Sequence, residues 1–136
     1  MSTPDLGRPR GRILVVEDDS EAAYYAVHVL TRMGHFDVVH TLDPVVALRR
    51  ATAESWDLVL TDVDLPGMTG LELLRALREA APALPVAVIT AHITNSADMD
   101  ALREQADAFL EKPVPPARLV AVAAALIARS AARPSA

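Results

Sequence analysis

The sequence has 136 residues and a formal net charge of −5; 51% of the residues are hydrophobic but only 4% are aromatic. This length suits one domain with one aliphatic core, and the negative charge gives no support for direct nucleic-acid binding. The chain lacks cysteine, which excludes disulfides and thiolate metal sites, and no apolar run approaches the ~20 residues that span a bilayer. We therefore expect a soluble cytoplasmic protein that does not enter a membrane.

The two ends of the chain differ in composition from the middle. Residues 1–11 contain two prolines, two glycines and no apolar periodicity, which predicts a disordered leader. Residues 130–136 are expected to form a flexible tail. The folded domain is therefore expected over residues 12–129.

Within that range, strand-like and helix-like segments alternate. The first strand is expected at 12–16 and the first helix at about 20–33, with Ser20 as its N-cap and Gly34 as its stop. A second strand at 36–40 precedes a helix that starts at Pro44. This helix is expected to turn Val45, Leu48 and Ala51 toward the core.

The alternation continues through the second half of the sequence. Strands are expected at 58–61, 86–89 and 108–110, and helices at about 70–79, 96–105 and 116–129. Three of the strands are uninterrupted aliphatic runs, which is typical of strands covered on both faces. Five βα units with short connections predict an α/β fold, a parallel sheet with helices on both sides.

Polar residues follow the apolar strands where each strand ends. Glu17 and Asp18 end the first strand, Asp62 the third and Thr90 the fourth, and Lys112 follows the fifth. In an open parallel sheet, ligands bind outside the carboxyl ends of the strands. Three acids, a hydroxyl and an ammonium at this edge predict a site for a divalent cation and a phosphoryl group.

Carboxylate oxygens are ligands that Mg²⁺ prefers. Asp18 and Asp62 can supply them from neighbouring strands, Glu17 can bind through a water, and the backbone carbonyl of Asp64 can be a further ligand. Acids this close repel each other, and a cation relieves the repulsion. Asp19 is interpreted as a cap or surface acid of the first helix.

Asp62 is also the best candidate for a nucleophile, because a carboxylate can form an acyl phosphate. Mg²⁺, Lys112 and Thr90 would each meet one phosphoryl oxygen. Lys112 precedes Pro113, and this bond can hold a fixed bend through a cis peptide.

These residues, in this order, resemble the receiver domain of two-component response regulators over about residues 12–129. The motifs that carry the resemblance are Ile-Leu-Val-Val-Glu17-Asp18-Asp19, Leu-Thr-Asp62-Val-Asp64-Leu-Pro66-Gly67-Met68-Thr-Gly70, Ile-Thr90-Ala91 and Phe109-Leu-Glu-Lys112-Pro113. The resemblance implies the flavodoxin-like (βα)5 receiver fold, a doubly wound five-stranded parallel sheet with strand order 2-1-3-4-5. It also implies a signalling phosphoacceptor rather than an enzyme.

The resemblance implies that Asp62 accepts a phosphoryl group from a histidine kinase or a histidine phosphotransfer protein, with Mg²⁺ held by Glu17 and Asp18. Lys112 would contact the phosphate and Thr90 would reorient toward it. Phe109 falls at the family's switch aromatic, where tyrosine is frequent.

The same resemblance assigns secondary roles and partners. Asp64 and His92 fall at positions that tune dephosphorylation in this family. The signalling face would be formed by the fourth helix, fifth strand and fifth helix. Its target would be a separate protein or an output domain of a longer chain, and phosphorylation-dependent homodimerisation is a further expectation.

Three other readings of these residues remain. Asp62-Val-Asp64 resembles the acid pair of haloacid-dehalogenase-like Mg²⁺-dependent phosphohydrolases, although the other acids here lie upstream. A flavodoxin-like cofactor module would need a phosphate loop after the first strand, where this chain is acidic. A pseudo-receiver that binds partners without phosphorylation is the third alternative.

Overall fold

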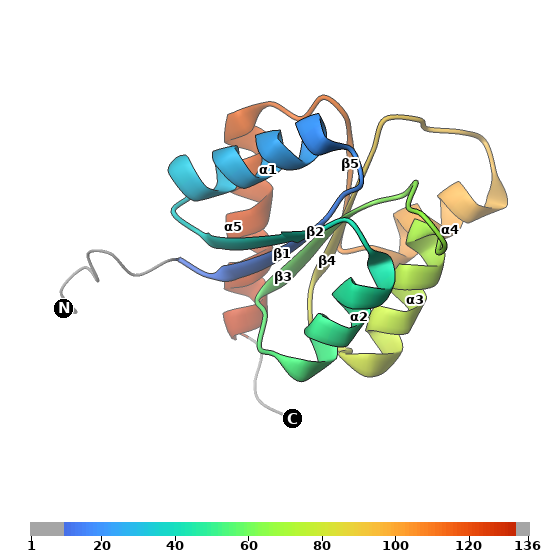
Figure 1. Ribbon diagram of the computed structural model, residues 1–136, viewed down its shortest axis with the longest axis horizontal. Helices are drawn as coiled ribbons and strands as arrows, with labels where there is room; N and C mark the ends of the chain where they lie inside the picture. Colours follow the sequence, from blue (N-terminus) through green and yellow to red (C-terminus); the bar gives the residue numbers. More distant parts are fainter. Residues whose placement is uncertain (1–9, 133–136) are drawn as a thin grey trace, which may run out of the picture.

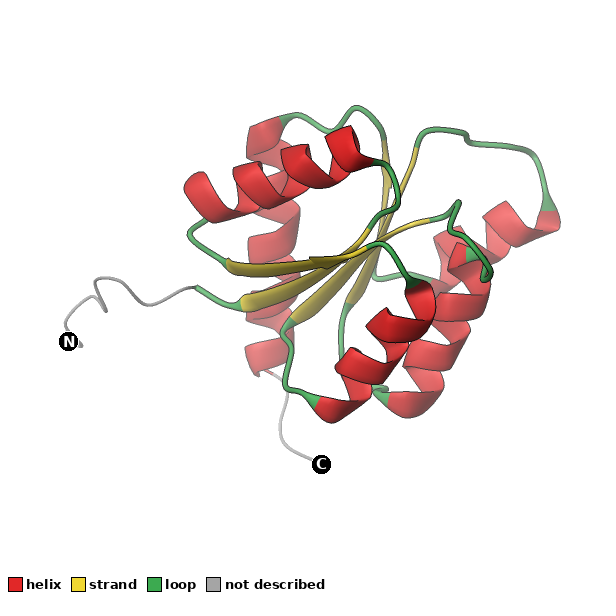
Figure 2. Ribbon diagram, viewed as in Figure 1, coloured by secondary structure: helices red, strands yellow, loops and turns green. Residues whose placement is uncertain are grey.

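The computed structural model describes residues 10–132; residues 1–9 of the predicted leader and residues 133–136 of the predicted tail lie outside this range. Strands and helices alternate through five βα units (Figures 1 and 2). The elements are β1 (Arg12–Val16), α1 (Ser20–Arg32), β2 (Asp37–Thr41), α2 (Pro44–Ala53), β3 (Leu58–Asp62), α3 (Gly70–Ala80), β4 (Val86–Thr90), α4 (Ala97–Gln105), β5 (Ala108–Glu111) and α5 (Pro116–Ala132). None of the helices in the described range is long and apolar enough to cross a membrane.

All neighbouring strands are parallel, and their order in the sheet is β2-β1-β3-β4-β5. Helices α1 and α5 lie on one face of the sheet, and α2, α3 and α4 lie on the other (Figure 1). This confirms the expected doubly wound α/β fold and its strand order. The strand order reverses between β1 and β3, and in open α/β sheets ligands bind outside the carboxyl ends of the strands at such a point.

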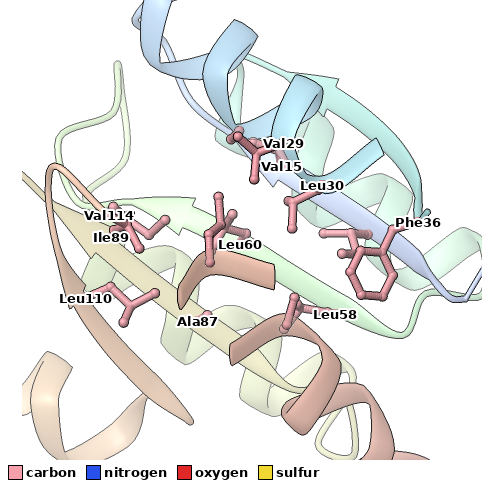
Figure 3. Close-up of a cluster of buried hydrophobic side chains, with 14 of the residues drawn as sticks. Val15, Val29, Leu30, Phe36, Leu58, Leu60, Ala87, Ile89, Leu110 and Val114 are labelled. Carbon is pink, nitrogen blue, oxygen red and sulfur yellow. The ribbon is translucent and has the colours of Figure 1, made fainter. Parts of the chain in front are cut away.

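Each face of the sheet has its own buried aliphatic cluster. The cluster under α1 and α5 includes Val15, Leu60 and Leu110 (Figure 3). The cluster under α2, α3 and α4 includes Val16, Val59 and Val88. Adjacent strand residues therefore serve opposite clusters, as the alternation of side chains along a strand requires.

The ends of two helices differ from the sequence-based expectation. Asp19, not Ser20, is the N-cap of α1, because its carboxylate accepts a hydrogen bond from the Ala22 amide at 2.8 Å. Helix α5 continues to Ala132, three residues beyond the predicted end. At Gly34, two positions after the end of α1, a Cβ would lie 2.7 Å from the Leu30 carbonyl oxygen, so this position has no room for a side chain.

Two predicted details of β2 and α2 are wrong. Strand β2 begins at Asp37, one residue later than expected; Phe36, which precedes it, is a buried core residue whose amide donates to the Leu30 carbonyl of α1 at 3.1 Å. In α2, Val45 is 48% exposed, whereas Ala47 is fully buried. The prediction for Val45 is therefore wrong, while Ala51 is buried and Leu48 packs against the core as predicted.

Candidate functional site at the carboxyl edge of the sheet

Glu17, Asp62 and Lys112 share one face of the sheet. Each follows by two positions a residue of the cluster under α1 and α5, namely Val15, Leu60 and Leu110. A period of two keeps side chains on one face. The three strand ends therefore direct two carboxylates and one ammonium to the same place, as the sequence predicted.

The ammonium of Lys112 lies between the two carboxylates. Its Nζ donates to Glu17 Oε1 at 2.6 Å and to Asp62 Oδ2 at 3.1 Å. The other Asp62 oxygen, Oδ1, accepts a hydrogen bond from the Val63 amide at 2.6 Å. Glu17 is only 5% exposed and Asp62 only 9%, so these charges interact with little screening by water.

The pKa of Glu17 is raised to about 7: burial raises it most and the hydrogen bond and charge of Asp62 add to this effect, while Lys112 opposes it. The pKa of Lys112 is raised as well: its partial burial acts to lower it, but the bonds and charges of Glu17 and Asp62 outweigh this effect. Two carboxylates thus share one cation. One ammonium cannot neutralise both carboxylates, so a further cation at this site would be favourable.

Asp18 adds a third carboxylate to the group. One oxygen from each of Glu17, Asp18 and Asp62 lies within 4.8 Å of the others, and Asp18 is exposed to solvent. Oxygen donors of this type, reachable from water, fit a hard divalent cation such as Mg²⁺. Asp19 takes no part, because its carboxylate caps α1.

The β3–α3 loop that follows Asp62 is tightly packed against α3. The Gly70 amide donates to the Val63 carbonyl at 2.8 Å. A Cβ at Gly70 would lie 2.7 Å from the Val63 Cα and 3.0 Å from the Asp62 carbonyl oxygen. Thr69 and Glu72 close a reciprocal capping box at the start of α3. These contacts fix the backbone next to Asp62.

Thr90 ends β4 on the opposite face of the sheet from the acids, two positions after Val88 in the cluster under α3 and α4. It is fully buried. Its hydroxyl bonds the backbone of His92 at 3.2 and 3.3 Å rather than the acids or Lys112. Its carbonyl accepts from the Lys112 amide at 2.8 Å. Thr90 is therefore tied to the site through backbone, with its side chain toward α4.

Phe109 lies on the same face as Thr90. Phe109 is paired with Val88 of the neighbouring strand β4. Its side chain packs against the cluster that contains Met99 and Leu102 of α4. The Arg103 guanidinium lies 5.2 Å from the centre of its ring. The two residues that the sequence assigned to a switch thus share one surface with α4.

Asp64 and His92 are both exposed and line one pocket of about 320 Å³ between the β3–α3 loop and the start of α4. Glu17, Asp62 and Lys112 line a different cavity of about 360 Å³, beside α1 and α5. The peptide bond between Lys112 and Pro113 is cis, as the sequence suggested.

Two side chains near the site were not predicted. The His40 Nε2 lies 2.7 Å from the Glu17 carbonyl oxygen. The Tyr25 hydroxyl donates to the Val114 carbonyl at 2.5 Å. His40 lies near the end of β2, so the search for polar residues at the carboxyl ends of strands could have found it. Tyr25 is a helix residue 89 positions from its partner, and nothing local in the sequence signals this contact.

Comparison with known proteins gives one consistent result. The model of the family described as "Response regulator receiver domain" matches residues 13–124. The transcriptional regulatory protein PrrA of Mycobacterium tuberculosis is 34% identical over 125 residues, which are 92% of this chain and 53% of PrrA. The chain spans about half the length of the curated relatives it matches.

Solved structures agree. The signal receiver domain of a signal transduction histidine kinase from Syntrophus aciditrophicus superposes with a TM-score of 0.80 at 28% identity, over 93% of this chain and 96% of that one. The receiver domain of a sensor histidine kinase from Pseudomonas aeruginosa gives 0.75 at 25% identity, over 87% and 98%. The crystal structure of the latter holds a magnesium ion coordinated in its active site cleft.

Proposed function

Because the chain belongs to the response regulator receiver domain family, we propose that it accepts a phosphoryl group on Asp62 from a histidine kinase or a histidine phosphotransfer protein. The observation that carries this proposal is the position of Asp62. Its nearly buried carboxylate ends central strand β3, 3.1 Å from the Lys112 ammonium and beside two further acids. Its role is that of a signalling phosphoacceptor.

In the transfer step, a carboxylate oxygen of Asp62 attacks the phosphorus of the donor phosphohistidine. The new O–P bond forms as the P–N bond breaks, and the leaving imidazole takes a proton from solvent. Hydrogen bonds from the Val63 amide and from Lys112 fix the orientation of the carboxylate beforehand. This pre-orientation lowers the entropic cost of reaching the reactive geometry.

Lys112 serves two stages of the cycle. In the resting protein, its ammonium neutralises part of the charge of Glu17 and Asp62. After transfer, the phosphoryl group brings about −1.5 to −2 charges to Asp62. The Lys112 ammonium then contacts a phosphoryl oxygen. This oxygen carries more negative charge than the Asp62 carboxylate, which has lost its charge in the acyl phosphate.

The residues that would hold Mg²⁺ are Asp18, Asp62 and the backbone carbonyl of Asp64, with Glu17 bound through a water. The carboxylate oxygens within 4.8 Å of one another support this ligand set. When bound, Mg²⁺ supplies positive charge that neutralises phosphoryl oxygens during the transfer.

Thr90 and Phe109 form the switch in this proposal. The Thr90 hydroxyl leaves the backbone of His92 and bonds a phosphoryl oxygen, and Phe109 turns into the space beside β5. Both lie on the face that α4 covers, so the change biases the surface formed by α4, β5 and α5. Asp64 and His92 set the lifetime of the phosphoryl group from the pocket beside α4.

The partners follow from the chemistry of the transfer. The donor is a phosphohistidine protein, and the target is a separate protein or a further domain of a longer chain. The cytoplasm is the compartment where such a donor would meet this chain.

The test is phosphorylation by acetyl phosphate with Mg²⁺, followed by intact mass. We expect one added phosphoryl group in the unsubstituted protein and in Asp64→Asn, a control that keeps the neighbouring loop. Asp62→Asn should gain none, and omission of Mg²⁺ should remove the product. Equal labelling of Asp62→Asn would refute the assignment.

A further inference from the structure

His40 contacts the backbone between two acids of the proposed Mg²⁺ site. Its Nε2 lies 2.7 Å from the carbonyl oxygen of Glu17. A carbonyl oxygen can only accept a hydrogen bond, so Nε2 carries the proton and donates. The acceptor belongs to the peptide group that joins Glu17 to Asp18.

The Glu17 carbonyl needs a side-chain donor because the backbone hydrogen bonds between β1 and β2 stop just before it. Val16 is opposite Thr41, and the Glu17 amide donates to the Thr41 carbonyl at 3.1 Å. In a parallel ladder, the next bond would run from the Asp43 amide to the Glu17 carbonyl. That amide instead donates to the Thr41 hydroxyl at 3.2 Å. The ladder has ended, and His40 replaces the missing donor.

The geometry points to His40 as a positioning residue for the acidic loop, an inference that rests on the proposed function. A peptide group is planar, so a bond to its oxygen fixes the orientation of both flanking Cα atoms. Here these are the Cα atoms of Glu17 and Asp18, whose carboxylates gather with that of Asp62. His40 therefore holds the two acids that follow β1 in the arrangement that receives the cation.

Groups that contact metal ligands but not the metal itself affect metal affinity, because they orient those ligands. His40 stands in this relation to Glu17 and Asp18, through backbone rather than through the carboxylates. Because its ring is exposed, substitution removes little core packing. Loss of the bond should reduce the order of the acidic loop while the fold stays intact.

The test measures the Mg²⁺ dissociation constant at one fixed pH, from amide chemical shifts of ¹⁵N-labelled protein. We expect His40→Ala to raise this constant roughly 3- to 10-fold, the equivalent of one hydrogen bond. Gln can place a side-chain N–H near the same point, so His40→Gln should stay within about twofold of the unsubstituted protein. His28→Ala is the matched control, since His28 is an exposed histidine that stacks on Tyr24 of α1.

A second readout separates positioning from a merely structural role. In acetyl phosphate reactions, His40→Ala should need more Mg²⁺ for half-maximal rate yet reach a similar rate at saturating Mg²⁺. Unchanged Mg²⁺ affinity in His40→Ala, or an equal loss in His40→Gln, overturns the inference and leaves the proposed function standing. Failure of the unsubstituted protein to bind Mg²⁺ overturns both.

Discussion

At the scale of single residues, the site is a balance between three carboxylates and one ammonium. Lys112 bonds Glu17 and Asp62 but leaves the group with excess negative charge. The sequence could predict these members, because each stands at the end of an apolar strand. It could not predict that the Thr90 hydroxyl bonds the backbone of His92, since that depends on how the β4–α4 loop turns.

We predict that Glu17→Gln stabilises the metal-free protein at pH 8 but not at pH 5. The pKa of Glu17 rises from 4.5 to about 7 on folding, mainly because of burial. The folded state therefore binds more protons between these values, and the stability contributed by Glu17 is present below pH 4.5 and lost as pH rises through 7. Gln stays neutral and avoids this loss, on the order of 1–3 kcal/mol.

The measurement is urea unfolding of chelator-treated protein at both pH values, with Glu21→Gln as the control because Glu21 is an exposed acid of α1. A stability difference between Glu17→Gln and the unsubstituted protein that is the same at both pH values would contradict this prediction.

At the scale of elements, α3 and α4 differ in how firmly they are held. Helix α3 buries five residues and begins with a capping box. Helix α4 buries only Met99 and Leu102, and residues 91–98 before and at its start are all exposed. The loop that leads to α4 reaches away from the body of the protein (Figure 1). The start of α3 therefore holds the backbone next to Asp62 in place. The start of α4 is less firmly packed, so it can move more easily.

We predict that backbone amides of α4 exchange with deuterium faster than those of α3, because less apolar burial opposes local opening. Addition of Mg²⁺ and beryllofluoride, a phosphoryl mimic, should change protection over residues 91–105 and at Phe109. In Asp62→Asn the mimic should have no effect. Changes confined to the loops around Asp18, Asp62 and Lys112 would exclude the proposed switch.

We predict that Gly70→Ala destabilises the protein by roughly 1–3 kcal/mol, although alanine is the better helix former. The new Cβ would lie 2.7 Å from the Val63 Cα, and both contacts nearest to it are backbone atoms that cannot rotate away. Thermal unfolding measures the change, with Glu79→Ala at an exposed α3 position as the control. A Gly70→Ala protein as stable as this control would show that the loop can shift.

The elements also show where sequence reasoning succeeds and where it ends. All ten elements were predictable, because short strand-like segments, three of them continuous aliphatic runs, alternate with segments of helical periodicity. The first inward residue of α2 was not predictable, since Val45 and Ala47 are both apolar and only packing distinguishes them. The cap of α1 was ambiguous for a similar reason: Asp19 and Ser20 are both good caps.

At the scale of the whole molecule, the sheet separates the charged group from the two residues that we propose as the switch. Its α1 and α5 face carries Glu17, Asp62 and Lys112, and its other face carries Thr90 and Phe109 against α4. The bond between the Lys112 amide and the Thr90 carbonyl joins the two sides at the sheet edge. In the proposed function, this bond is the route by which a charge added at Asp62 affects the opposite face, across two adjacent strand ends.

We predict that Mg²⁺ stabilises the whole molecule by mass action, by about 1.4 kcal/mol at a concentration ten times its dissociation constant. Thermal unfolding with and without Mg²⁺ measures this. Asp18→Ala should abolish most of the response. Asp19→Ala should keep it while losing about 1 kcal/mol of baseline stability, because Asp19 caps α1. A full Mg²⁺ response in Asp18→Ala would refute the proposed ligands.

The central claim is that Asp62 carries the phosphoryl group, and chemical mapping of the product tests it most directly. Borohydride reduces an aspartyl phosphate to homoserine, so protein treated with acetyl phosphate and Mg²⁺ is reduced, digested and sequenced by mass spectrometry. We predict homoserine at position 62 and at no other acid of the group. Homoserine at position 18 or 64 instead, or none in protein that has gained a phosphoryl group, would contradict the account.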